Sequence, residues 1–145
     1  MSDRNKDVVS TRAPEPVGAF PHAKRVGDFL FLSGIGPRKR GTKEIPGVAL
    51  DPGGRIKSYD FEIQCRSTLD NIAAILAEAG LGLEHVVRIN AFVTGREHLR
   101  PYMDVRNRRF SHPLPASTLM IVSGFARPEF TVEIEVIAAG PAGVA

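Results

Sequence analysis

Hydrophobic and polar positions alternate over the closing stretch of the chain, residues 130–139. β-Branched residues fill this stretch, which predicts a strand whose side chains point alternately to opposite faces. One face is apolar, and the other carries Thr131, Glu133, Glu135 and Ile137. Carboxylates are costly to bury, so we expect these two to meet solvent, a partner chain or a catalytic task.

Further segments upstream show strand patterns. Residues 20–26 and 29–33 flank Gly27-Asp28, which is typical of a β-hairpin, and the second of these strands is apolar enough for burial on both faces. Residues 85–93 and 117–122 predict two more strands. In the first of them, one face is expected to carry Val87, Ile89, Ala91 and Val93.

Two helices are predicted between these strands. The first spans residues 61–79, with Asp60 as its N-cap and Gly80 as its stop. Its apolar stripe consists of Phe61, Cys65, Leu69, Ile72 and Leu76. The second helix runs from about 99 to 110 and is expected to face the core with Leu99, Tyr102, Met103 and Phe110.

The order of these elements predicts an α+β fold in which a sheet is covered on one face by both helices. Residues 38–54 indicate a loop in which only 47–50 suggest a short strand. The second face of the sheet is too apolar to remain in water, so we expect the chain to associate with copies of itself.

Composition narrows the class of protein. With 145 residues, 43% hydrophobic and 24% charged, the chain is expected to be one globular domain over 14–145, preceded by a flexible arm over 1–13. It has no apolar run near the roughly 18 residues of a membrane span. The single cysteine, Cys65, cannot form an internal disulfide and lies on a helix stripe, so we expect a buried thiol in a cytoplasmic protein.

The basic residues do not predict nucleic-acid binding. Net charge is +3 and the sequence pI is about 9.4. The densest basic segments, 38–40 and 106–109, have no interleaved aromatic residues and are interpreted as solvated surface. RNA binding or cleavage is therefore not expected.

Several motifs together resemble the RidA (YjgF/YER057c/UK114) family. They are Gly-Ala-Phe-Pro-His-Ala at 18–23, the hairpin at 26–34, Pro-Ala-Ser at 115–117 and Val-Glu-Ile-Glu-Val-Ile-Ala at 132–138. Within the family, the first motif and the segment at 33–38 look most like the 2-aminomuconate deaminase branch. The resemblance implies a chorismate-mutase-like fold and a homotrimer with pockets between subunits.

The resemblance also implies a chemistry. Family members hydrolyse reactive enamines and imines to carbonyl compounds and ammonia, without metal or organic cofactor. Glu133 matches the family's acidic position and is implied to move protons, while Glu135 is expected to make a structural contact. His22 is either a second acid/base group or a hydrogen-bonded structural residue. The implied substrate-binding residues are Phe20, Ser33, Gly34, Ile35, Ser117, Leu119 and Arg127.

One departure from the family pattern affects the expected substrate, a carboxylate-bearing enamine or imine. Most deaminating members carry an arginine where this chain has Ser117, and a serine cannot hold a carboxylate bidentately. Losing such a contact costs about 1.5 to 3 kcal/mol in binding. Arg127 or Arg38 is a candidate for a displaced cation. The alternative hypothesis is a trimeric small-molecule-binding or regulatory protein without deaminase activity.

Overall fold

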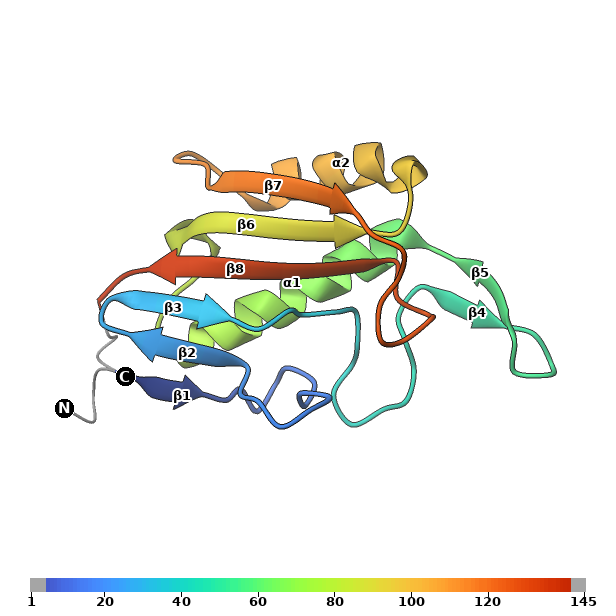
Figure 1. The fold of residues 1–145 in the computed structure, drawn as a ribbon, viewed down its shortest axis with the longest axis horizontal. Helices are drawn as coiled ribbons and strands as arrows, with labels where there is room; N and C mark the ends of the chain where they lie inside the picture. The colour runs from blue at the N-terminus through green and yellow to red at the C-terminus, as the bar shows by residue number, and fades with distance from the viewer. Residues whose placement is uncertain (1–4, 142–145) are drawn as a thin grey trace.

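The computed structural model describes residues 5–141, which form a sheet backed by two helices (Figure 1). The strands are β1 (Lys6–Val8), β2 (Ala23–Val26), β3 (Phe29–Leu32), β4 (Val48–Leu50), β5 (Ile56–Tyr59), β6 (Val86–Val93), β7 (Ala116–Ile121) and β8 (Val132–Ala139). The helices are α1 (Phe61–Glu78) and α2 (Leu99–Arg109), with 3-10 turns at Leu83–His85 and Arg96–His98. The predicted α+β class is confirmed.

The sheet has the order β1-β2-β3-β8-β6-β7, with β4 and β5 forming a separate hairpin. Only β6 and β7 pair in parallel, and the other neighbours in the large sheet are antiparallel. The last strand in the chain, β8, therefore lies at the centre of the sheet between β3 and β6. This central place explains why every second residue of β8 is apolar and buried.

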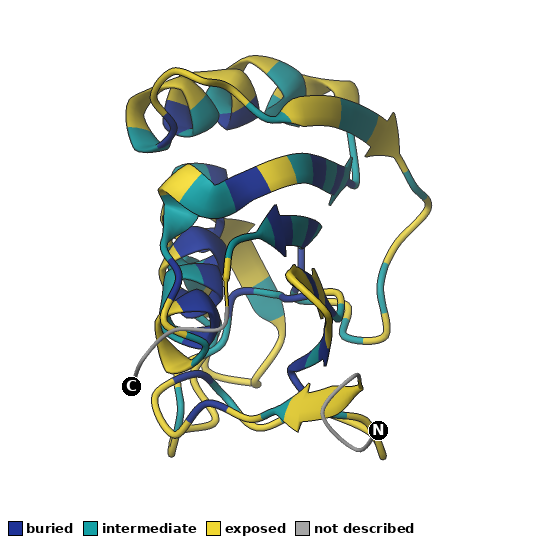
Figure 2. Cartoon of the chain, turned by 90° about the vertical axis from the view of Figure 1, so that its left-hand side faces the viewer, coloured by how far each residue is buried: buried dark blue, intermediate teal, exposed yellow. Residues whose placement is uncertain are grey.

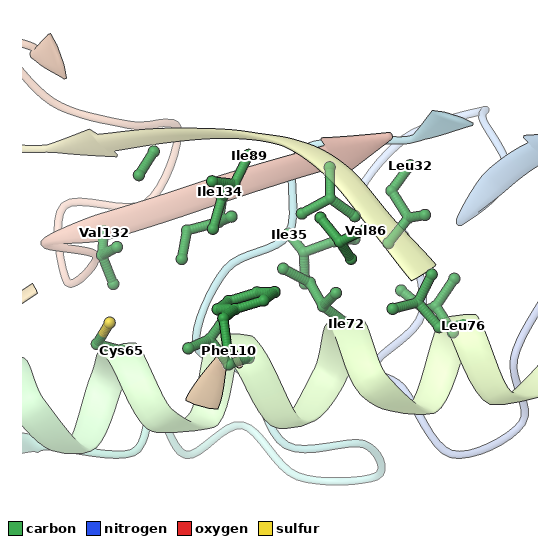
Figure 3. Close-up of a cluster of buried hydrophobic side chains, with 14 of the residues drawn as sticks. Leu32, Ile35, Cys65, Ile72, Leu76, Val86, Ile89, Phe110, Val132 and Ile134 are labelled. Atoms are coloured by element: carbon green, nitrogen blue, oxygen red, sulfur yellow. The ribbon is translucent and has the colours of Figure 1, made fainter. Parts of the chain in front are cut away.

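The core lies between the sheet and α1. On β8, alternate residues Val132, Ile134, Val136 and Ala138 are all buried, as the alternation predicts. They meet the apolar stripe of α1, where Cys65, Ile72 and Leu76 point at the strands (Figure 3). Burial raises the pKa of the Cys65 thiol to about 12, which fits the expectation of an unreactive buried thiol.

The ends of α1 follow their sequence signals. The Asp60 carboxylate accepts a hydrogen bond from the Ile63 N–H at 3.1 Å, satisfying one of the free donors of the first turn. Gly80 follows the helix with φ of 74°, a left-handed conformation that glycine adopts without a steric penalty. These two residues fix the length of the helix that backs the sheet.

Strand β6 departs from its predicted alternation. A β-bulge interrupts its pairing with β8 between Val86 and Arg88, so the intervening Val87 is 45% exposed whereas Val86 is buried. The prediction that Val87 shares a face with Ile89 was therefore wrong. An extra residue in one strand shifts every side chain before it to the opposite face.

On α2 the predicted core positions were partly wrong. Tyr102 and Phe110 are buried, but Met103 is 37% exposed and Val105 takes its place in the core. Tyr102 and Val105 are three residues apart and share one helical face, whereas Met103 is rotated by about 100° from Tyr102. The helix buries a narrower stripe than its apolar residues suggested.

The expectation of a flexible arm over 1–13 does not hold for the described residues 5–13. Here β1 pairs with β2, and Ser10 and Ala13 are fully buried, so the domain's own surface holds this segment. Residues 1–4 lie outside the described part of the chain. The structure also adds β5, which pairs with the predicted short strand β4.

The face of the sheet away from the helices, called the outer face below, lacks a cover in the single chain. Phe29 is 49% and Phe31 42% exposed, while the alternate residues Leu30 and Leu32 are buried under the helices. Figure 2 shows residues of different burial following one another along the strands of the sheet. The expected burial of β3 on both faces thus requires another chain. Within residues 5–141, no helix is long and apolar enough to cross a membrane.

Candidate functional site

A cavity of about 250 Å³ lies where the segment after β3 passes the start of β8. It is enclosed by residues from three connecting segments: the N-terminal segment 13–22, the turn after β3 and the connection before β8. Most of the lining is apolar. The polar and charged side chains in it are Glu15, His22, Ser33, Arg38, Arg127 and Glu133.

Glu133 points from β8 into this cavity. Burial raises the pKa of its carboxyl group, and the neighbouring Glu135 carboxylate raises it further. Among residues 5–141, no side chain donates a hydrogen bond to it. Its space depends on Gly34, since any Cβ at that position would collide with the Glu133 carboxylate oxygen. The carboxylate is thus partly desolvated, unpaired and close to the backbone of the turn.

Glu135 occupies a different environment on the same strand. Its carboxylate accepts a hydrogen bond from the Asn90 side chain at 3.2 Å, across the pairing of β8 with β6. The structural contact expected of Glu135 is therefore present. Glu135 ties two strands together, whereas Glu133 is available to a ligand.

His22 lines the cavity but is only 2% exposed, and both of its ring nitrogens bind backbone. Its Nδ1 accepts from the Ser10 N–H at 2.9 Å, and its Nε2 lies 2.6 Å from the Pro14 carbonyl, to which it donates. This pattern describes a neutral imidazole that holds the N-terminal segment in place. It favours the structural interpretation of His22 over the acid/base one.

The other predicted residues of this region also line the cavity. Phe20 forms part of its exposed rim, and Arg127 comes from the connection before β8. The Ser33 hydroxyl donates to the Pro21 carbonyl at 2.9 Å, and Ile35 exchanges backbone hydrogen bonds with Ile134. Ser33 and Ile35 thus shape the turn that presents Gly34 to Glu133.

Two predicted residues do not join this group. Ser117 and Leu119 lie on β7 and do not line the cavity. Ser117 is in register with Ile89, which is buried under the helices. Glu133 is in register with Phe92, three residues further along β6. Because side chains alternate along β6, Ser117 and Glu133 belong to opposite faces of the sheet.

Arg106 is a cation that the sequence interpretation missed. From α2 its Nη1 donates to the Ser117 hydroxyl at 3.4 Å, and its guanidinium lies 5.7 Å from the centre of the Tyr102 ring. The spacing of four residues between Tyr102 and Arg106 was a usable signal, because such residues share one face of a helix. The interpretation of residues 106–109 as solvated surface was therefore incomplete for Arg106.

The described residues contain no cluster of three or more histidine, cysteine or acidic side chains able to hold a metal ion. The cavity itself presents one unpaired carboxylate, two guanidinium groups and mostly apolar walls. A carboxylate whose pKa is raised toward neutrality suits proton transfer. Guanidinium groups suit the binding of anions.

Solved structures with this architecture place the chain in a known structural class. RidA from an Antarctic Psychrobacter species superposes with a TM-score of 0.81 at 26% sequence identity, covering 93% of this chain and 99% of that one. Escherichia coli TdcF, solved with bound serine, gives a TM-score of 0.79 at 26% identity over 93% and 98% of the two chains. The class is the RidA-type α+β fold.

Sequence comparison identifies the family. Residues 10–140 match the family described as Endoribonuclease L-PSP. A RutC family protein of Pyrococcus abyssi is 31% identical over 135 residues, which are 92% of this chain and 96% of that protein. The 2-iminobutanoate/2-iminopropanoate deaminase of Dermatophagoides farinae is 28% identical over 91% of this chain and 94% of its own length. The chain belongs to the Endoribonuclease L-PSP family, to which the RidA and YjgF proteins also belong.

Proposed function

We propose that the protein is a hydrolytic deaminase of reactive imines and enamines, with Glu133 as its proton-transfer group. The observation that carries this proposal is the Glu133 carboxylate, which is unpaired, partly desolvated and held against Gly34 in a cavity. The family and its related imine deaminase support the same chemistry. A carboxyl group with a raised pKa can act both as a base and as an acid near neutral pH.

The reaction requires the addition of water to the imine carbon. The Glu133 carboxylate accepts a proton from water as the oxygen bonds to that carbon, and the electrons of the C=N bond move to nitrogen. The resulting carboxylic acid returns that proton to nitrogen, which gives a carbinolamine. Glu133 then takes the proton of the new hydroxyl group and passes it to the same nitrogen, so that the C–N bond breaks, ammonia leaves and the C=O bond forms. An enamine first becomes the imine by proton transfer to its β-carbon. One imine and one water thus give one carbonyl compound and one ammonia.

The proposed assembly is a homotrimer with pockets between subunits. The half-exposed Phe29 and Phe31 on the outer face support self-association, because a soluble protein rarely leaves such a patch uncovered. Ser117 and Glu133 lie on opposite faces of one chain. For both to contact the same substrate, they must come from different subunits.

The proposed substrate carries a carboxylate, as a 2-aminomuconate-type compound does. Arg106 supports this because its side chain lies beside Ser117. Most deaminating relatives have an arginine at the position of Ser117. A guanidinium at this place supplies the charged fork that serine lacks. In the cavity, we propose that Phe20 and Ile35 contact apolar parts of the substrate and that Arg127 contacts an anionic part.

A second candidate function is the binding of a small carboxylate without turnover. Ser117 is the observation that favours it, because the family arginine is absent from that position. TdcF, a structural relative, has been solved with bound serine. Under this hypothesis a carboxylate ligand binds, and Glu133 contributes to the pocket without catalysing a reaction.

Ammonia release from imines separates the two functions. Imines are generated in situ from amino acids by an amino-acid oxidase, and their hydrolysis is followed in competition with semicarbazide. The deaminase hypothesis predicts that Glu133→Gln lowers kcat by about a hundredfold or more with little change in KM. Glu135→Gln is the matched control on the same strand, assayed at a pH above the acid limb of the activity profile, where Glu133 is ionised in both proteins. Wild-type protein as inert as Glu133→Gln over a panel of imines would leave only the binding function.

A further inference from the structure

Two arginines share a wall of the cavity that contains Glu133. Arg38 comes from the segment after β3, and Arg127 comes from the connection before β8. They are close enough to repel each other, since the pKa of Arg38 is lowered first by burial and then by the charge of Arg127. Two like charges side by side in a partly desolvated wall are unfavourable unless an anion lies near both.

The protein neutralises this pair only in part. Arg38 donates from Nη2 to the backbone carbonyl of Glu15, which carries no charge. The Glu15 carboxylate pairs with Arg40 at 3.0 Å, and its charge offsets only part of the lowering of the Arg38 pKa. Within residues 5–141, no carboxylate forms an ion pair with Arg38. Arg127 binds Glu129 only through Nε, at 3.3 Å, which leaves its two terminal nitrogens for another partner.

Glu133 is not that partner. The pKa of its carboxyl group is raised, by burial and by Glu135, whereas an arginine paired with it would lower the pKa. The cavity therefore has two separate polar ends. One presents a carboxylate suited to proton transfer, and the other presents a pair of guanidinium groups suited to an anion.

A second cavity of about 310 Å³ adjoins the first and continues beyond Arg38 and Arg127. It shares Pro14 and Glu15 with the first cavity as well. Its charged lining is dominated by cations, namely Arg38, Lys39, Arg40, Lys43 and Arg127 against Glu15 and Glu44. The cations of the second cavity thus add to the positive potential around Arg38 and Arg127.

We propose that Arg38 and Arg127 bind a second carboxylate of the substrate, remote from the carbon at which water adds. The substrate class is then an imine or enamine of a dicarboxylic acid. The hydrolysis of such a substrate rests on the proposed deaminase function, whereas the binding of an anion by the two arginines does not. It makes Arg38 and Arg127 specificity-determining residues, a role separate from that of the carboxylate site beside Ser117.

The test compares two imines that differ in the second carboxylate. Oxidases generate 2-iminoglutarate from glutamate and 2-iminopropanoate from alanine, and kcat/KM is measured for each with full-length protein. Arg127→Gln is expected to lower the ratio of kcat/KM for 2-iminoglutarate over 2-iminopropanoate by about ten- to a hundredfold, since each charge-assisted bond is worth that much. Arg127→Lys keeps the charge without the fork and is expected to lie between the two.

Arg100→Gln is the matched control, because Arg100 is an exposed arginine on α2 that lines neither cavity. It is expected to leave the ratio unchanged. Arg38→Gln is measured only if its melting temperature matches that of wild type, since Arg38 also holds the N-terminal segment. An equal loss for both imines in Arg127→Gln, or no loss at all, would overturn the inference while leaving the deaminase function standing.

Binding of inert analogues tests the site without turnover. Calorimetric titration of wild type is expected to give a Kd for glutarate about tenfold lower than for butyrate, and Arg127→Gln to remove that difference. If wild type hydrolyses neither imine but shows this preference, the deaminase proposal fails and the anion site stands. Equal affinity of wild type for glutarate and butyrate would remove the anion site.

Discussion

The two faces of the central sheet are built from alternate residues of the same strands, yet they differ in almost every physical property. On β8, Ile134 and its alternate neighbours are buried under α1, whereas Glu133 and Glu135 lie on the other side among half-exposed apolar residues. The helix side is complete within one chain. The outer face carries an unpaired carboxylate and an apolar surface that the chain itself does not cover.

The two faces therefore have different roles: one stabilises the fold, and the other carries the candidate site. The helix side supplies stability, because its residues are fully removed from water. The outer face leaves Glu133 partly desolvated and leaves Phe29 and Phe31 available to another chain. The opposite placement of Ser117 and Glu133 adds a geometric reason for a second subunit.

Truncation of the helix-side core is expected to have the largest effect on stability. Ile134→Ala removes a fully buried side chain at the centre of the sheet and should lower the free energy of unfolding by about 2 to 5 kcal/mol. Urea denaturation of wild type and variant measures the difference. A loss below about 1 kcal/mol would show that this face is not the main source of stability.

A charge on the outer face is expected to break self-association without unfolding the chain. Phe31→Asp places a carboxylate among Phe29 and Ile137, so sedimentation should show the mass falling from an oligomer to a monomer. Leu50→Asp, on an exposed apolar residue of the β4–β5 hairpin, is the control and should keep the oligomer. A monomeric wild type, or an unchanged mass for Phe31→Asp, would contradict the proposed assembly.

Replacement of His22 is expected to loosen the N-terminal segment. His22→Phe leaves the buried Ser10 N–H and the Pro14 carbonyl without partners, which should cost about 1 to 3 kcal/mol of stability and increase hydrogen exchange over 10–14. The exposed His112→Phe is the control. If His22→Phe instead abolished turnover as fully as Glu133→Gln, with hydrogen exchange unchanged, His22 would be a catalytic group.

The smallest expected effect concerns the pH profile. The first step needs the Glu133 carboxylate in its ionised form, so kcat/KM should rise with pH through the pKa of this group. Glu135 raises that pKa, and Glu135→Gln should therefore move the acid limb of the profile to lower pH. A shift to higher pH, or none, would show that Glu135 does not act on the ionisation of Glu133.

Much of the fold was predictable because its signals are periodic. The alternation in β8 and the stripe on α1 each repeat over several residues, and Asp60 and Gly80 mark the ends of the helix with known chemistry. The bulge at Val87 has no such mark, since one extra residue leaves the composition of a strand unchanged. Short strands such as β1 and β5 pair through their backbones and leave only a weak pattern.

The candidate site was predictable only in its local parts. Gly34 and Glu133 were identified from a resemblance of motifs, and the structure brings them into contact. The N-terminal segment that closes the cavity and the reach of Arg106 toward Ser117 depend on tertiary contacts between distant segments. His22 was ambiguous in the sequence because only the structure supplies the hydrogen-bond partners of its ring.

In the proposed assembly, one site combines Glu133 of one subunit with the region of Ser117 on the next. Mixed oligomers of Glu133→Gln and Ser117→Trp, refolded together in equal amounts, test it by imine hydrolysis. Each variant alone should be nearly inactive, whereas in the mixture about one quarter of the sites join two intact halves. Activity near a quarter of wild type supports the shared site. Activity no higher than that of the separate variants would contradict it.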